Sequence, residues 1–148
     1  MRYVNTLVRG MAAAAIVAGL AGCTTVAKEP QPVRAVYHLT SGIDEAQRAM
    51  GNIRNHLNAD PTAKIVVVGN GNGIEFMLDG AKDKNGNPFD ATIQDLKGKG
   101  VDFRLCNNTL VTRKIDRSKV IPDVTVVPSG LAEAANLQAR EGFAYLRP

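Results

Sequence analysis

The sequence predicts an α/β domain built on a mostly parallel sheet with helices on both faces. Strand-like and helix-like segments alternate along the chain from residue 33 onward. Residues 64–68 (KIVVV) form a nearly continuous β-branched run, which is typical of a strand buried on both faces of a parallel sheet. Apolar residues in 43–57 recur at helical spacing, which predicts a helix with one buried stripe.

The first half of the domain begins with a strand over 33–39 (VRAVYHL). The helix over 43–57 follows and ends before an Asp-Pro pair, which stops a helix. The strand over 64–68 runs into a tight glycine loop at 69–73 (GNGNG), and a short helical turn is expected over 74–78.

The second half follows a polar loop over 79–88 and repeats the alternation. Its strands are expected at 101–105, 124–127 and 143–146, and its helices from 90 to 98 or 100, over 107–117 and from 130 to 142.

The N-terminus has the pattern of a secretory signal. Arg2 and Arg9 form a short basic region, 11–20 is apolar, and small residues follow. The apolar run is about half the roughly 20 residues that span a bilayer. Leu20-Ala21-Gly22-Cys23 resembles the lipobox of bacterial lipoproteins. The resemblance implies that residues 1–22 are removed and that Cys23 is acylated. Because Thr24 follows the cysteine, it also implies an anchor in the outer membrane, with the protein facing the periplasm.

Processing changes the size and charge of the chain. Removal of residues 1–22 leaves 126 residues, of which 23–32 read as a polar tether and 33–148 as one domain. The count of Lys and Arg falls from 18 to 16 against 14 acidic residues, so the net charge is +2. The chain has no Trp and no basic cluster interleaved with aromatics, so nucleic acid is not an expected partner.

Cys106 is the candidate catalytic residue. The chain has two cysteines, and lipidation consumes Cys23, so Cys106 has no partner for an internal disulfide. It follows the strand at 101–105, at the carboxyl edge where parallel sheets place their sites. The start of the next helix would stabilise a thiolate there. A buried, inert cysteine is the alternative, and the position alone does not decide between them.

Other candidate sites carry weaker patterns. His38 ends the first strand, where it would orient or protonate a group near the thiol or serve only as a structural histidine. Residues 70–72 (NGN) would bind phosphate through N–H groups, but a plain tight turn is favoured because the dinucleotide and Walker patterns are incomplete. Residues 83–87 read as a turn rather than a calcium loop. No zinc-ligand spacing and no nucleophile elbow occur, so no metal or cofactor is expected.

The strand at 101–105 has one polar side. Asp102 and Arg104 alternate with apolar residues, which is unusual for a strand covered on both faces. We expect either an edge strand or a side that meets another subunit, and we favour the second.

Three segments resemble the DsrE/DsrF-like family of small sulfur-relay proteins. They are 36–39 (VYHL), 99–110 (KGVDFRLCNNTL) and the C-terminal region from 126 (VVPSGLAE) to 146. The resemblance implies a flavodoxin-like three-layer sandwich that assembles into homotrimers or homohexamers. In active members, a cysteine after the third strand carries a persulfide that passes between proteins, and Cys106 matches that position.

These observations predict a membrane-tethered sulfur carrier or sulfurtransferase. Cys106 would exchange sulfur with donor and acceptor proteins, supported by Asn107, His38 and Ser129, without metal or nucleotide. The alternative is a non-catalytic binding or scaffold lipoprotein in which Cys106 is inert. A third possibility is a small-ligand site at the glycine loop.

Overall fold

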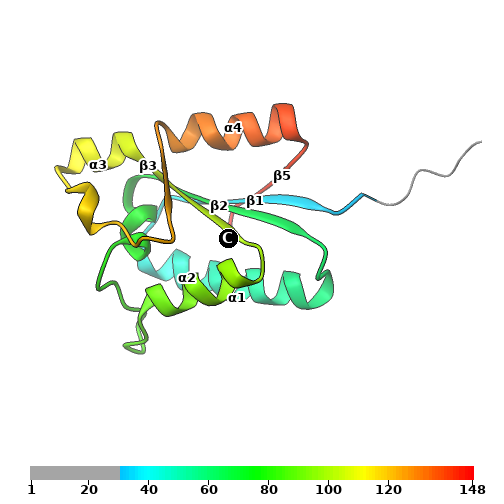
Figure 1. Ribbon diagram of the computed structural model, residues 1–148, viewed down its shortest axis with the longest axis horizontal. Helices are drawn as coiled ribbons and strands as arrows, with labels where there is room; N and C mark the ends of the chain where they lie inside the picture. Colours follow the sequence, from blue (N-terminus) through cyan, green and yellow to red (C-terminus); the bar gives the residue numbers. More distant parts are fainter. Residues whose placement is uncertain (1–30) are drawn as a thin grey trace, which may run out of the picture. The chain divides into compact units, whose positions relative to one another are not determined.

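A five-stranded parallel sheet forms the centre of residues 31–148, the part of the chain that the computed structural model describes (Figure 1). The predicted signal peptide, Cys23 and nearly all of the predicted tether lie outside the described residues. The sheet order is β4-β3-β2-β1-β5. The strands are β1 (Arg34–Leu39), β2 (Lys64–Gly69), β3 (Asp102–Cys106), β4 (Thr125–Val127) and β5 (Ala144–Leu146). The predicted α/β, flavodoxin-like fold class is confirmed.

Helices cover both faces of the sheet. Figure 1 shows α1 and α2 on one side of the sheet and α4 on the other. The helices are α1 (Ile43–Ala59), α2 (Phe89–Gly98), α3 (Asn107–Arg113) and α4 (Gly130–Glu141), with 3₁₀ helices η1 (Gly71–Met77) and η2 (Arg117–Lys119). Within 31–148, none of them combines the length and apolar character needed to cross a membrane.

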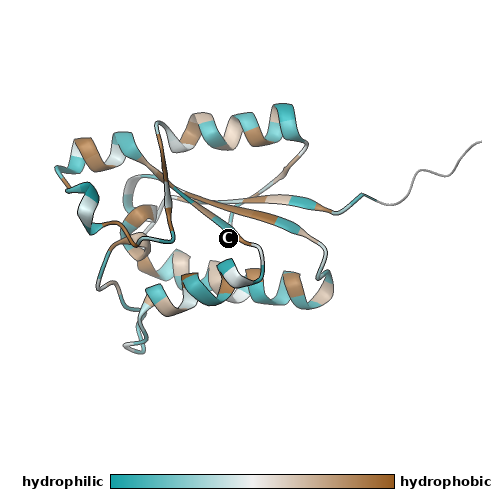
Figure 2. Cartoon of the chain, viewed as in Figure 1, coloured by the Kyte–Doolittle hydropathy of each residue, from teal (hydrophilic) through white to brown (hydrophobic). Residues whose placement is uncertain are grey.

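Alternate residues of each strand enter two separate cores. In β2, Ile65 and Val67 join the larger core beneath α1 and α2, while Val66 and Val68 join the smaller core. The smaller core lies under α4, which contributes Leu137. Because both faces are covered, β2 is buried and apolar on both sides after Lys64, and Figure 2 shows mostly apolar residues along the central strands. This explains the continuous β-branched run in the sequence.

The glycine loop is more helical than predicted. Its 3₁₀ helix η1 begins at Gly71 rather than near residue 74, and the loop passes close to the end of β1. The Asn70 N–H donates to the Leu39 carbonyl at 3.1 Å. A side chain on Gly73 would overlap that same Leu39 carbonyl. Glycine is therefore required at this position by the close approach of two backbone segments.

The third helix is shorter than predicted. α3 ends at Arg113, and Lys114 takes a left-handed conformation with φ of 53°. The N–H of Ile115 donates to the Leu110 carbonyl at 2.9 Å, and the Ile115 side chain packs against the larger core. Burial of Ile115 thus turns the chain out of the helix.

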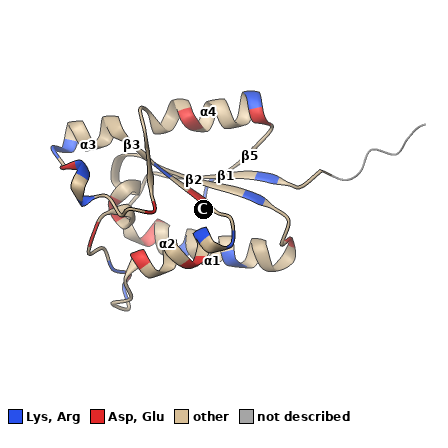
Figure 3. Ribbon diagram, viewed as in Figure 1, with Lys and Arg blue, Asp and Glu red and all other residues tan. Residues whose placement is uncertain are grey.

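The polar side of β3 is satisfied within the chain. β3 lies between β2 and β4, so the edge-strand interpretation is wrong. Arg104 Nε donates to Asp102 Oδ2 at 2.8 Å, and Arg104 also pairs with Glu133 of α4. This ion-pair network explains the polar side without a second subunit. Elsewhere, acidic and basic residues are interspersed over helices and loops (Figure 3).

We predict that Gly73→Ala destabilises the domain by about 1–3 kcal/mol, the usual cost of forcing atoms into packed space. Urea unfolding measures the change. Gly51→Ala is the matched control, because a side chain at this α1 position meets no atom within 4 Å. It should stabilise the protein by about 0.5–1 kcal/mol through helix propensity. Equal midpoints for the two variants would contradict the close approach at Gly73.

Candidate functional site

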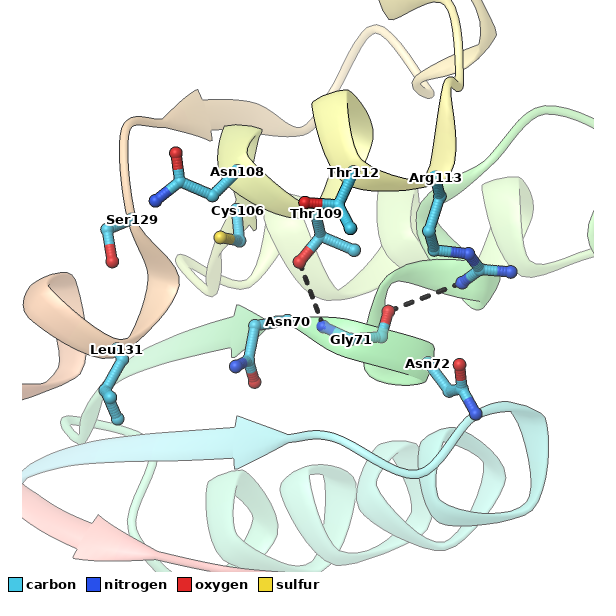
Figure 4. Close-up of a pocket in the computed structure, with 10 residues that line it drawn as sticks. All are labelled: Asn70, Gly71, Asn72, Cys106, Asn108, Thr109, Thr112, Arg113, Ser129 and Leu131. Atoms are coloured by element: carbon cyan, nitrogen blue, oxygen red, sulfur yellow. Dashed lines mark hydrogen bonds between the residues drawn. The ribbon is translucent and has the colours of Figure 1, made fainter.

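A pocket of about 490 Å³ opens at the carboxyl edge of the sheet, beyond β2, β3 and β4 (Figure 4). It is lined by Asn70, Gly71, Asn72, Cys106, Asn108, Thr109, Thr112, Arg113, Ser129 and Leu131. The ends of β2, β3 and β4 therefore share one pocket, whereas the end of β1, with His38, does not line it. In the described residues, no group of His, Cys, Asp and Glu side chains is arranged to hold a metal ion.

Cys106 lies at the junction of β3 and α3. It is the last residue of the strand and the N-cap of the helix. Only 5% of the residue is exposed, yet it contributes to the pocket wall. Gly130, the first residue of α4, packs against it so closely that a side chain there would come within 3.1 Å of Cys106 Cβ. The thiol is thus held between the starts of two helices.

Two opposing effects set the acidity of the thiol. Burial raises the pKa of Cys106, because it disfavours the charged form. The N–H groups of Gly130, Thr109 and Asn108 and the hydroxyl of Thr109 point to the sulfur and lower the pKa. The donors prevail, so the pKa of Cys106 lies below its ordinary value. Within the described residues, the Cys106 side chain makes no capping hydrogen bond. The Asn108 N–H also donates to the Pro128 carbonyl at 3.3 Å, so Gly130 and Thr109 supply the less engaged donors.

The glycine loop is tied to α3. The Gly71 N–H donates to Thr109 Oγ1 at 3.0 Å, and Arg113 reaches the Gly71 carbonyl at 3.4 Å. Arg113 also pairs with Glu75 at 3.1 Å. The N–H groups of Asn70, Gly71 and Gly73 are all bonded within the protein. The loop is therefore a braced turn, and these three groups are not open to a phosphate.

His38 reaches the pocket through Asn70 rather than through the thiol. It is 4% exposed, and its Nε2 lies 2.9 Å from Asn70 Oδ1. Its Nδ1 lies 2.7 Å from the Tyr145 hydroxyl oxygen. The amide oxygen only accepts, so Nε2 carries the proton and Nδ1 accepts from the tyrosine.

The other predicted supporting residues differ in position. Ser129 lines the pocket and caps α4, accepting the Ala132 N–H at 3.4 Å. Asn107 begins α3, but among the described residues it is Asn108 and Thr109 that line the pocket. Sequence reasoning missed Thr109 as a functional residue, although a hydroxyl three residues after an N-cap is placed to reach the cap side chain.

We predict that Thr109→Val raises the pKa of Cys106, because it removes a hydroxyl that stabilises the thiolate. The pH profile of Cys106 alkylation should move to higher pH, and the rate at neutral pH should fall several-fold. Thr109→Ser keeps the hydroxyl and should restore the profile. Thr112→Val also alters the pocket wall and should leave the profile in place. If the pH profile of Thr109→Val does not shift, the Thr109 hydroxyl does not lower the pKa of Cys106.

The comparisons with known proteins agree with this geometry. The model of the DsrE/DsrF-like family matches residues 27–148. Among solved structures, MTH1491 from Methanobacterium thermoautotrophicum, a protein of unknown function, is 27% identical with a TM-score of 0.69. The match covers 78% of this chain and 99% of that one. The ychN protein from E. coli shares the fold at 16% identity and a TM-score of 0.63, with 80% and 100% of the two chains covered. A search of curated proteins gave no match. The chain belongs to the DsrE/DsrF-like family.

Proposed function

We propose that this protein is a sulfur carrier that holds sulfur as a persulfide on Cys106. Family membership supports a sulfur-relay role at the level of the family. For this chain, the proposal rests on the groups that surround the Cys106 thiol. Cys106 forms part of the wall of an open pocket, and backbone and hydroxyl donors lower its pKa despite burial.

The reaction needs no oxidant or reductant. The Cys106 thiolate attacks the terminal sulfur of a polysulfide and forms a new S–S bond. The S–S bond of the donor breaks, and the shortened polysulfide leaves with the electron pair. An acceptor thiolate then attacks the outer sulfur, and Cys106 departs as a thiolate. The donors that lower its pKa therefore serve both steps, since a thiol of low pKa also leaves faster.

A binding or scaffold protein with an inert Cys106 is the second candidate. The observation that favours it is burial, because only 5% of the residue is exposed. Buried cysteines in apolar surroundings do not react. The two candidates differ in whether the thiol reacts while the protein is folded.

We predict that the folded protein gains the mass of one sulfur atom on exposure to polysulfide. The Cys23→Ser variant is the starting protein, because Cys106 is then its one cysteine. Adding Cys106→Ser should abolish the gain, as read by intact-mass spectrometry, and thermal melting verifies the fold. Reaction of Cys106 only after denaturation would overturn the carrier proposal in favour of the scaffold.

We also propose that Cys23 carries lipid that anchors the protein to the outer membrane, facing the periplasm. The four lipobox residues 20–23 support this. Metabolic labelling with palmitate should mark the wild-type protein, and Cys23→Ala should remain an unlabelled precursor. Cys106→Ala is the control and should keep the label. Labelling that survives Cys23→Ala would disprove the anchor.

We further propose that the domain forms homotrimers or homohexamers. The family resemblance supports this, and Val111 and Leu131 remain 69% and 65% exposed. An interface over Val111 and Leu131 would remove their apolar surface from water. Light scattering should give a trimer or a multiple of it, and Leu131→Lys should shift the mass toward the monomer. A wild-type monomer at micromolar concentration would contradict the assembly.

A further inference from the structure

Two hydroxyls of the pocket wall accept hydrogen bonds within the protein. Thr109 Oγ1 accepts the Gly71 N–H at 3.0 Å, and Ser129 Oγ accepts the Ala132 N–H at 3.4 Å. Thr109 and Ser129 therefore both use their oxygen as an acceptor within the protein and keep the hydroxyl proton as a donor, which in Thr109 is directed at the Cys106 sulfur.

The side-chain oxygen of Asn70 is also engaged as an acceptor, here at the end of a chain of hydrogen bonds through His38 and Tyr145. Tyr145 donates to Nδ1 of His38, and Nε2 of His38 donates to Asn70 Oδ1. His38 is 4% exposed, so its ring cannot turn to water for other partners. With Oδ1 fixed on the histidine, the amide Nδ2 is the part of Asn70 left for a ligand. In the described residues, no buried polar side-chain atom lacks a partner, so this free donor is open to solvent.

The Asn70 amide and the thiol lie at neighbouring positions of the pocket wall and point in different directions. Figure 4 shows Asn70 between Cys106 and β1, with its side chain directed away from the sulfur. Of the ten lining residues, Arg113 is the one that carries a charge, and no carboxylate is among them. A ligand that extends from the sulfur to Asn70 thus meets the Asn70 amide N–H at that end and no carboxylate on the pocket wall, which favours an anion.

We propose that Tyr145 and His38 position the Asn70 amide so that the pocket selects compounds with an anionic group over neutral ones. The positioned donor binds the anionic end while Cys106 attacks the other end. Only the identity of the ligand as a sulfur compound rests on the carrier function. The preference for an anion rests on the hydrogen bonds of the pocket.

The chain offers a matched control for this arrangement. Its two histidines are both bonded to a tyrosine hydroxyl through Nδ1. Tyr37 and His56 form the second pair at 3.0 Å, and neither lines the pocket. Tyr145→Phe and Tyr37→Phe therefore remove the same bond, one inside the proposed chain and one outside it.

The test compares iodoacetate, which is anionic, with iodoacetamide, its neutral analogue. The full-length Cys23→Ser protein is alkylated at Cys106 by each reagent. Both react with the thiolate, so the ratio of the two rates cancels the thiolate fraction and reports the anion preference of the pocket. We expect a ratio above that of a free thiol such as glutathione.

Asn70→Asp should lower this ratio about tenfold, since it replaces a charge-assisted donor by a carboxylate. Tyr145→Phe should lower it about threefold, as one hydrogen bond of the chain is lost. Tyr37→Phe should leave it unchanged. The proposal would be overturned if Asn70→Asp left the rate ratio unchanged, or if both tyrosine variants lowered it equally. Failure of polysulfide uptake with a responsive ratio would instead reject the carrier function alone.

Discussion

The close packing of Gly130 against Cys106 and Asn70 fixes the geometry of the carboxyl edge. A side chain at Gly130 would lie 3.1 Å from Cys106 Cβ and 3.2 Å from Asn70 Cβ. It is this absence of a side chain that lets the start of α4 meet the ends of β2 and β3 in one place. The Gly130 N–H then reaches the sulfur, and Ser129 enters the pocket wall. Close contact between backbone segments thus brings the parts of the site together.

The same proximity explains how a buried thiol becomes acidic. Burial favours the neutral thiol, so an apolar wall around Cys106 would make it inert. Here the N–H groups of Asn108, Thr109 and Gly130, at the starts of α3 and α4, point to the sulfur and have no partners inside their own helices. The groups that bury Cys106 are therefore also the groups that stabilise its thiolate.

The sequence predicted the fold well because its signals are local. The β-branched run at 64–68 and the helical stripe at 43–57 each report burial within one element. The polar side of β3 was harder to interpret, since Glu133, which pairs with Arg104, lies 29 residues away. The bond between His38 and Tyr145 joins residues 107 positions apart. Contacts of that separation arise only when β5 pairs with β1, and residue spacing alone does not show them.

The length of α3 and the role of Thr109 also depended on tertiary structure. Helix propensity does not stop the third helix at Arg113; the docking of Ile115 on the core does. Thr109 can be placed near the cap from sequence, but its bond to Gly71 requires the glycine loop to lie beside α3. The local sequence pattern thus predicted the position of Cys106. The groups that surround its sulfur are brought there by the packing of β2, β3 and α4, which the local pattern does not show.

The limited exposure of Cys106 bears on which compounds can reach the thiol, independently of its acidity. Cys106 is 5% exposed at the wall of an open pocket, so a compact sulfur compound can approach it along the pocket. A cysteine on the surface of another folded protein would need to be carried on a protruding segment to reach the sulfur. In the oxidising compartment proposed for this chain, that restriction protects a lone thiol from disulfide formation with unrelated proteins. Burial, which first favours an inert cysteine, is therefore compatible with a carrier that must react with few partners.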